Sequence, residues 1–338
     1  MSELRQDPVT GVVTVLEPQR ALRPRDHAFP VKTLNDAADC PFCPGHEDRT
    51  PPPQLELSLP GEATWTVRAF ENLYPALTAG DEEDWPRELD ARWPYSGTSG
   101  FGAHDVIVES PRHDDSISRY TPQHAALLVD AWAERLRHWR ADGRFASALV
   151  FRNEGAAAGA SMSHPHSQVI ALPRVPEALV RELGNFSEEA TLTRRCILCA
   201  AMEADDAGGR VVFDDGVTAV HAPWASPTPH FMRIAPRRCS DSLADVSPEE
   251  RASLGAALVA ATAALTGALG EVAFNLVLHD VPYSARPAGL PFHWHVEVLP
   301  RQGDQAGFEW GSGIYTNVVD PDVAAAELRA GLDRRRVE

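Results

Sequence analysis

The stretch that decides how this chain is interpreted is His164-Pro165-His166-Ser167-Gln168, preceded by Asn153-Glu154-Gly155-Ala156-Ala157-Ala158-Gly159-Ala160-Ser161. Residues two apart share one face of an extended strand, so one histidine can be held while the other reacts. The glycines and Ser161 can bring backbone N–H groups and a hydroxyl against a phosphate. A neutral imidazole beside an anion-binding loop predicts a nucleophile that attacks phosphorus. The alternative is two ordinary histidines after an Ala/Gly linker, and the whole string favours the nucleophile.

The bulk composition limits the classes of function. A chain of 338 residues can hold two ordinary domains or one large one. Its formal charge of −17 argues against nucleic-acid binding, which needs a basic surface, but allows a small anionic ligand held by local arginines. Without a long uninterrupted apolar run or an apolar signal core, we expect no membrane span and a cytoplasmic location. There the five cysteines would be reduced, and close pairs indicate metal sites.

Helices and strands recur in the same order in the two halves of the chain. The first half shows a helix and two strands, expected at 122–142, 148–151 and 164–172. The second half shows the same series, expected at 248–269, 272–279 and 292–299. This repetition predicts an α+β fold whose halves arose by internal duplication, with antiparallel sheets and packed helices. We place the two domains at 1–176 and 177–338.

The first half contains a complete set of zinc ligands, Cys40, Cys43, His113 and His164. Two cysteines and two histidines would fill all four positions of a tetrahedral site, so the zinc would be structural. It would hold the strand that carries His164 and thereby place His166. Free thiols or a redox pair are the alternative, but the cysteines lie in a proline-rich loop without the strand-then-helix context of a redox motif.

The second half repeats the pattern with Cys196, Cys199, Cys239 and His293. The spacing from the first cysteine to the first histidine of the His-x-His pair is 124 residues in one half (164 − 40) and 97 in the other (293 − 196). A second zinc site accounts for every remaining cysteine, whereas the alternative is three buried thiols. A competing set, which suits iron or zinc, is Glu182, His279, His293 and His295. Because His293 belongs to both sets, we expect that both cannot form unchanged.

His166 is the predicted nucleophile. Its attack on the α-phosphorus of a nucleotide would give a nucleotidyl-histidine, which a second phosphate then accepts. Ser161 and Gln168 can donate hydrogen bonds to the phosphate oxygens where charge grows. The amide of Gln168 supplies no acid or base for water, which favours transfer over hydrolysis. Its counterpart in the second half is Glu297, a poor neighbour for phosphate, so one half is expected to be active and the other degenerate.

These motifs resemble the galactose-1-phosphate uridylyltransferase family of the histidine-triad superfamily, over nearly the whole chain. The matching segments are Asp7-Pro8-x-Thr10-Gly11, Arg20-Ala21-x-Arg23-Pro24, Cys40-Pro41-Phe42-Cys43, Glu71-Asn72-x-x-Pro75, Ser110-Pro111-x-His113, Asn153 through Gln168, Phe292-His293-Trp294-His295-Val296-Glu297 and Gly307-Phe308-Glu309. The resemblance implies two histidine-triad-like halves, a nucleotidyl-histidine intermediate on His166 and zinc on the first ligand set.

The resemblance also implies roles for further residues. Contacts to the nucleotide base, ribose or phosphate are implied for Asn72, Asn153, Gly159, Ser161 and Gln168. Phosphate contacts across a homodimer are implied for Arg20 and Arg23, since such enzymes take them from the partner subunit. Glu309 would face the hexose. Tyr315 stands where well-known members have a glutamine that contacts the sugar phosphate, and a nearby phosphate-holding lysine has no clear counterpart.

Three functions therefore stay open at the level of sequence. The default is transfer of UMP between a nucleotide-sugar and a sugar 1-phosphate, with UDP-glucose and galactose-1-phosphate as the substrate pair. The second is a phosphorylase or adenylyltransferase that uses inorganic phosphate as acceptor and an ADP-sugar or dinucleotide as donor. The third is a non-catalytic, zinc-stabilised nucleotide-binding module, which would leave His166 idle.

Overall fold

The computed structural model describes residues 2–22, 36–80, 88–90, 92–283, 292–303 and 305–337. Its main sheet has ten strands in the order β3-β4-β5-β7-β6-β11-β12-β10-β9-β8, and neighbouring strands pair antiparallel throughout. The first five strands of this order are Leu55–Leu57, Val67–Glu71, Ala103–Val108, His166–Leu172 and Ser147–Glu154. The last five are Phe274–His279, His295–Pro300, Met232–Pro236, Thr218–His221 and Val211–Asp214. The prediction of an α+β fold with antiparallel sheets is confirmed.

The sheet order shows the duplication directly. Each half supplies five consecutive strands, and the two sets meet where β6 pairs with β11. The pairing also has the same register on both sides: Phe151 opposes Gln168 in the first half, and Val277 opposes Glu297 in the second. The two halves are therefore related strand by strand.

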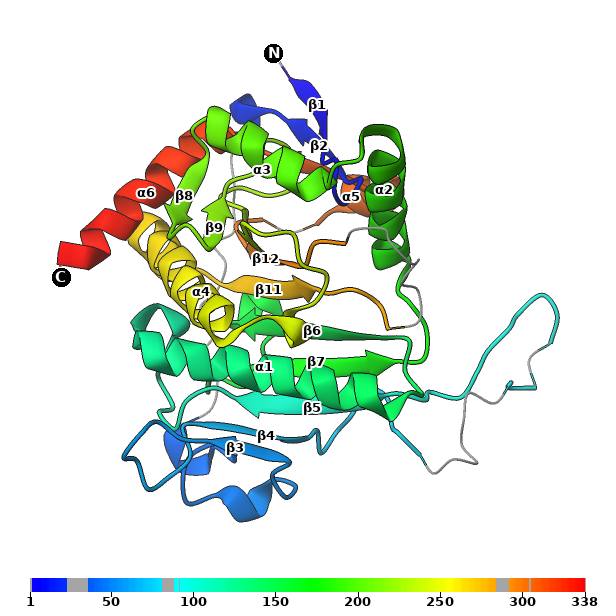
Figure 1. Ribbon diagram of the computed structural model, residues 1–338, viewed down its shortest axis with the longest axis vertical. Coiled ribbons are helices and arrows are strands. Elements are labelled where there is room, and N and C mark those ends of the chain that lie inside the picture. Colours follow the sequence, from blue (N-terminus) through cyan, green and yellow to red (C-terminus); the bar gives the residue numbers. More distant parts are fainter. Residues whose placement is uncertain are drawn as a thin grey trace.

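Two long helices cover one face of the sheet, α1 (Pro122–Asp142) over the first half and α4 (Pro248–Leu269) over the second (Figure 1). Both match the predicted helices at 122–142 and 248–269. Thr121 caps α1 and Ser247 caps α4 through a capping box, each followed by a proline at the first helical position. By length and composition alone α4 could cross a membrane, but most of it is buried. It packs as a core helix against α1 and α6 (Pro321–Val337).

The crossing of α4 and α6 depends on two glycines. A Cβ atom at Gly267 would lie 2.1 Å from the carbonyl oxygen of Gly331, and one at Gly331 would lie 2.4 Å from the carbonyl oxygen of Ala264. Any side chain at either position would therefore force the two helices apart. This close approach fixes the C-terminal helix against the duplicated core.

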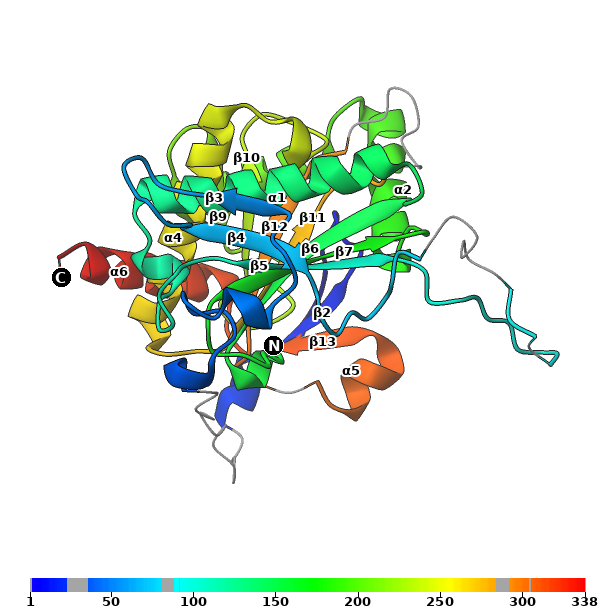
Figure 2. The same ribbon diagram turned by 90° about the horizontal axis from the view of Figure 1, so that it is seen from below.

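A second, smaller sheet lies on the side of the main sheet away from α1 (Figure 2). Its strands are β1 (Glu3–Gln6), β2 (Val13–Leu16) and β13 (Ile314–Asn317), and β13 runs parallel to β2. The short helix α5 (Gly307–Ser312) precedes β13. Two further helices, α2 (Glu177–Thr193) and α3 (Ile197–Ala207), pack together after the first half. The N-terminal strands and β13 thus come together in one layer that the repeat does not predict.

The predicted strands at 164–172 and 292–299 both begin later than expected. β7 starts at His166 and β12 at His295, so His164 and His293 precede their strands. Each of these two histidines instead uses Nε2 to bond a backbone carbonyl that is distant in sequence, Ser110 O at 2.7 Å and Pro236 O at 2.9 Å. The first histidine of each pair is therefore held at the end of a neighbouring strand, β5 in the first half and β10 in the second.

Candidate active site and metal clusters

The His166 side chain lies on the face of the sheet opposite α1. The adjacent Ser167 accepts a hydrogen bond of 2.8 Å from Trp132 of α1, and alternate residues of a strand face opposite ways. His166 Nδ1 lies 2.9 Å from the carbonyl oxygen of His164. Nδ1 therefore carries the proton and donates it, which leaves the lone pair on Nε2. Burial lowers the pKa of His166, so the ring is neutral near pH 7. The ring is therefore fixed and neutral with one nitrogen free, as the predicted role of nucleophile requires.

The loop before β7 has the shape that the glycines predicted. It forms a single turn, Ala156–Ala158, between Gly155 and Gly159, which have φ values of 78° and 86°. These are conformations that favour glycine. Gly159 and Ser161 are exposed, as an anion-binding loop requires. The loop thus connects β6 to the nucleophile strand with exposed polar groups.

A residue of the second half orients the predicted ligand-binding Asn153. Asn275 on β11 opposes Asn153 on β6, and its Nδ2 donates to Asn153 Oδ1 at 2.7 Å and to Ala158 O at 2.8 Å. Sequence analysis missed Asn275, because its partner lies in the other half of the chain. The available signal was the polar Asn275 between the apolar Phe274 and Leu276 of the same strand.

Gln168 and Asn72 are connected through another residue that sequence analysis missed, His104. His104 Nε2 lies 2.9 Å from Gln168 Oε1, and the Asn72 amide lies 3.3 Å from the same ring. These residues come from the end of β4, from β5 and from β7, three strands that neighbour one another in the sheet. Two of the predicted ligand contacts therefore belong to one hydrogen-bonded group.

The first predicted metal set is brought together. Ligand atoms of Cys40, Cys43, His113 and His164 all lie within 4.8 Å of one another. The Sγ atoms of Cys40 and Cys43 lie 3.7 and 3.6 Å from His164 Nδ1. A tetrahedral site with bonds of about 2.0–2.3 Å needs ligand separations of about 3.5 Å, so the residues fit a divalent ion. Burial and the adjacent Cys40 raise the pKa of Cys43 to about 11, so its thiolate needs a nearby cation.

The second set is also brought together, but not in competition with the histidine set. Ligand atoms of Cys196, Cys199, Cys239 and His293 form one cluster, with both Cys196 Sγ and Cys199 Sγ 3.5 Å from His293 Nδ1. Glu182, His279 and His295 form another, without His293. The expectation that both sets cannot form unchanged is therefore confirmed, because the histidine set forms without His293. The bond from His293 Nε2 to Pro236 O turns the His293 ring toward the cysteines. The His295 ring stacks on His279, with their ring centroids 4.7 Å apart.

The second histidine of the second half is buried in a network of charges. His295 is fully buried, and its Nδ1 bonds the carbonyl oxygen of His293 at 3.1 Å, as His166 does with His164. Next to it on β12, Glu297 pairs with Arg233 at 2.9 Å, and Arg233 also pairs with Asp7 at 3.0 Å. Burial would raise the pKa of Glu297, but His279 and Arg233 hold it well below its usual range. The position that Gln168 has in the first half is therefore taken in the second half by Glu297, which forms an ion pair with Arg233.

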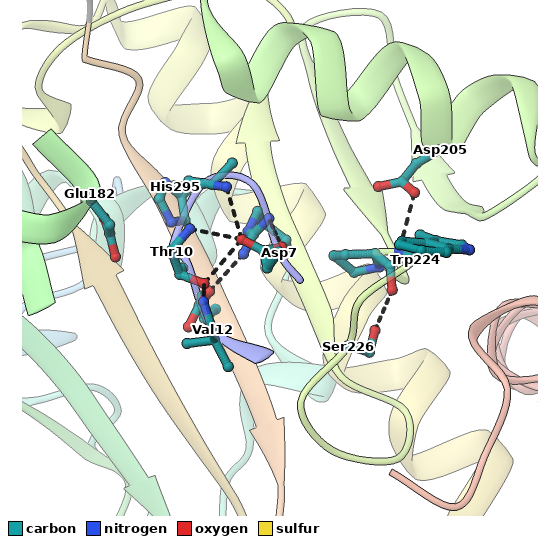
Figure 3. Close-up of polar contacts among 12 residues, drawn as sticks. Asp7, Thr10, Val12, Glu182, Asp205, Trp224, Ser226 and His295 are labelled. Carbon is teal, nitrogen blue, oxygen red and sulfur yellow. Dashed lines mark hydrogen bonds and ion pairs between the residues drawn. The ribbon is translucent and has the colours of Figure 1, made fainter. Parts of the chain in front are cut away.

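The N-terminal segment closes this second site. Asp7 Oδ1 accepts hydrogen bonds from the N–H groups of Val9 and Thr10, and Figure 3 draws this turn together with His295 and Glu182. Val9 is fully buried in an apolar cluster that includes Phe292. The turn that matches the family pattern near residue 7 is thus a structural cover for the second half.

The remaining predicted residues lie in the small sheet and its connections. Tyr315 on β13 pairs with Thr14 on β2, and Glu309 on α5 accepts a hydrogen bond of 3.0 Å from Thr316. Arg20 lies in the turn Pro18–Leu22 and is exposed. Burial raises the pKa of Glu309, but hydrogen bonds from the Ala306 backbone and from Thr316, together with the charge of Arg20, bring this pKa below its ordinary value. Arg23 lies outside the described residues. In the described ranges, no contact joins Arg20, Glu309 or Tyr315 to His166.

Comparison with known proteins places this arrangement in a family. A family model described as galactose-1-phosphate uridyl transferase, N-terminal domain, matches residues 1–176. The chain belongs to this family. Over 335 residues it is 32% identical to ADP-glucose phosphorylase from Arabidopsis thaliana, covering 97% of this chain and 92% of that relative. It is 26% identical to galactose-1-phosphate uridylyltransferase from Thermotoga maritima, covering 97% of this chain and 98% of the relative.

Solved structures agree with the sequence comparison. The crystal structure of the Arabidopsis thaliana ADP-glucose phosphorylase with bound ADP-glucose superposes with a TM-score of 0.85 at 30% identity, covering 97% of this chain and 99% of that one. A uridylyltransferase structure superposes with a TM-score of 0.76 at 27% identity, covering 99% of both chains. The family membership predicted from the motifs is confirmed, and the chain is a nucleotidyltransferase of this family.

Proposed function

We propose that this enzyme transfers a nucleoside monophosphate through a nucleotidyl-histidine on His166, with an ADP-sugar such as ADP-glucose as donor and inorganic phosphate as acceptor. The observation that carries the mechanism is the fixed Nδ1–H of His166, which leaves Nε2 free on the strand that follows the glycine loop. Nε2 attacks the α-phosphorus and forms a P–N bond, while the bond from the α-phosphorus to the bridging oxygen breaks and releases the sugar phosphate. The acceptor phosphate then takes the nucleotidyl group and frees His166.

Two observations support ADP-sugar phosphorolysis over the UDP-glucose and galactose-1-phosphate pair that the motifs made the default. The phosphorylase relative is 32% identical, against 26% for the uridylyltransferase from Thermotoga maritima. The chain also contains a single lysine, Lys32, so no lysine lies near Tyr315 in the sequence to hold a sugar phosphate. Uridylyl transfer between sugar phosphates stays the second candidate, because the matching family model and further relatives bear that name.

Zinc is the ion that best fits the two cysteine-containing clusters. Thiolate and imidazole in a four-ligand set, without an open position, are typical of structural zinc. In this proposal the first ion holds His164, and through the carbonyl of His164 it holds the ring of His166. The binding of Arg20 and Arg23 to phosphate in a partner subunit, and hence a homodimer, is part of the same proposal. It is supported by the exposed position of Arg20 in the turn Pro18–Leu22.

The test is label transfer to the protein. The enzyme is incubated with ADP-glucose or UDP-glucose labelled at the α-phosphorus, without acceptor, and acid-labile label on the chain is measured. Inorganic phosphate, glucose-1-phosphate or galactose-1-phosphate is then added. We expect label from ADP-glucose and its release as ADP by inorganic phosphate. Label from UDP-glucose that leaves only with galactose-1-phosphate would favour the second candidate, and no label from any donor would refute the mechanism.

A further inference from the structure

His104 on β5 links three backbone and side-chain groups at the edge of the nucleophile site. The Ala76 N–H donates to His104 Nδ1 at 3.1 Å, and His104 Nε2 lies 2.9 Å from Gln168 Oε1. The Asn72 Oδ1 accepts the Tyr74 N–H at 2.9 Å, which turns the Asn72 amide nitrogen toward the His104 ring. Both ring nitrogens of His104 thus face a defined neighbour.

The contacts fix which nitrogen of His104 carries the proton. A backbone N–H is always a donor, so Nδ1 must accept from Ala76 and must be unprotonated. The neutral ring then carries its proton on Nε2, which is the opposite tautomer to that of His166. Burial lowers the pKa of His104, although its bond to Gln168 opposes the change, and this favours the neutral ring.

The tautomer of His104 in turn fixes the amide of Gln168. Because Nε2–H is a donor, the atom that it meets must be the amide oxygen, and the amide NH2 must point the other way. Gln168 and His166 are two apart on β7 and share a face of the strand. Among the described residues no partner is found for Gln168 Nε2. Both of its hydrogens are therefore available to a phosphate at His166.

We propose that His104 is a positioning residue that locks the Gln168 amide with its NH2 toward the reacting phosphate, an inference that rests on the proposed function. A comparison with the second half supports a link between His104 and Gln168. Val106 opposes Gln168 and Arg233 opposes Glu297, so the residues two before them correspond, His104 and Phe231. Where Gln168 is replaced by a carboxylate, the histidine that would orient an amide is replaced by phenylalanine.

Two substitutions of His104 separate this role from a structural one. His104→Gln keeps a donor near the position of Nε2, whereas His104→Asn keeps an acceptor for the Ala76 N–H but cannot reach Gln168. Removing one preorganised donor costs about 10²- to 10³-fold, and a donor that is free to rotate loses less. We expect the rate of His166 labelling to fall roughly tenfold in His104→Asn and His104→Ala and to stay near wild type in His104→Gln. Equal or better activity in His104→Asn than in His104→Gln would overturn the proposal.

A double-mutant cycle completes the test. If His104 acts only through Gln168, His104→Ala in a Gln168→Ala background costs no further activity, whereas additive losses would contradict the role. The matched control is His230→Ala, since His230 is equally buried and hydrogen-bonded at both ring nitrogens but lies in the second half. That control is expected to lower thermal stability and leave labelling unchanged.

A spectroscopic readout tests the tautomer itself. Ring ¹⁵N shifts of the wild-type enzyme should show His104 protonated on Nε2 and His166 protonated on Nδ1, and the reverse for His104 would refute the assignment. Wild-type enzyme that takes no label from any nucleotide-sugar would refute the proposed function and with it the role of His104. Labelled wild type with an unaffected His104→Ala would refute the role of His104 alone.

Discussion

β7 and β12 carry the same His-x-His pattern and hold the second histidine in the same way, by a bond from Nδ1 to the carbonyl two residues earlier. Their surroundings differ. Gln168 is partly exposed on the strand that follows an exposed glycine loop, whereas Glu297 pairs with Arg233, which also pairs with Asp7 of the N-terminal turn. His295 Nε2 is buried without a partner. From this difference we infer that a prepared imidazole is not sufficient, and we expect access and a neutral donor beside it to decide which half can bind phosphate.

The sharpest way to break this comparison is to remove each second histidine in turn. His166→Ala should abolish labelling, a loss of roughly 10³-fold or more, because no other group can form the P–N bond. His295→Ala should keep labelling within a few-fold, since its ring is enclosed by protein. A folded His295→Ala variant without labelling, or a labelled His166→Ala variant, would contradict the assignment of roles to the two halves.

Exchanging the neighbouring residue tests the electrostatic part of the comparison. Gln168→Glu gives the first half the residue type of Glu297. It removes a hydrogen-bond donor and places a carboxylate beside the phosphate, so the labelling rate should fall about 10²- to 10³-fold. The reciprocal Glu297→Gln should leave labelling intact. It should lower the free energy of unfolding by about 2 kcal/mol, because Arg233 loses a charged partner. Denaturant unfolding and labelling rates, measured on both variants, decide the matter.

Metal analysis compares the two cysteine clusters. We expect about two zinc ions per chain, and about one in either Cys43→Ser or Cys196→Ser. Both variants should melt earlier, but only Cys43→Ser should also lose activity, because His164 positions His166. One zinc per wild-type chain, unaffected by Cys196→Ser, would show that the second cluster holds none.

The pH dependence follows from the lowered pKa of His166. Burial lowers this pKa, so the ring stays neutral and the labelling rate should be flat from about pH 8 down to about 6.5, the ordinary value for histidine, and fall only below it. The unfolded chain binds a proton at this ring before the folded enzyme does, so stability also decreases as pH falls through 6.5. Labelling is therefore measured with thermal melts at each pH. A decline that begins above pH 7 would contradict a buried neutral nucleophile.

The smallest expected effect concerns the contact between the halves. Asn275→Ala removes the bonds from Asn275 Nδ2 to Asn153 and Ala158 but leaves Asn153 in place. We expect a rise of a few-fold in KM for the nucleotide-sugar with little change in kcat, because one hydrogen bond contributes about 1 kcal/mol. An unchanged KM would show that Asn153 needs no support from the second half.

Much of the fold could be predicted from local patterns. The caps at Thr121 and Ser247 and the glycines after both long helices are properties of short segments, and those helices match the prediction. The pairing of the small sheet could not be predicted, because β13 and β2 lie nearly a whole chain apart in the sequence. The first cysteine cluster was predictable from residue types. That His293 joins the cysteine cluster while His295 joins the histidine cluster could not be predicted. It depends on contacts with Pro236 and His279, which lie in other strands.

The sequence by itself determined the chemistry: the His-x-His pattern, the glycine loop and two sets of cysteines and histidines allow few other reactions, because ligand and nucleophile types are fixed by their side-chain atoms. Only the tertiary structure decided which atoms are available. The tautomer of His104, the orientation of Gln168 and the closure of the second half by Asp7 and Arg233 arise from hydrogen bonds between segments that are far apart in the sequence. Strand pairing brings these groups together across long stretches of chain, and local patterns carry no information about such contacts.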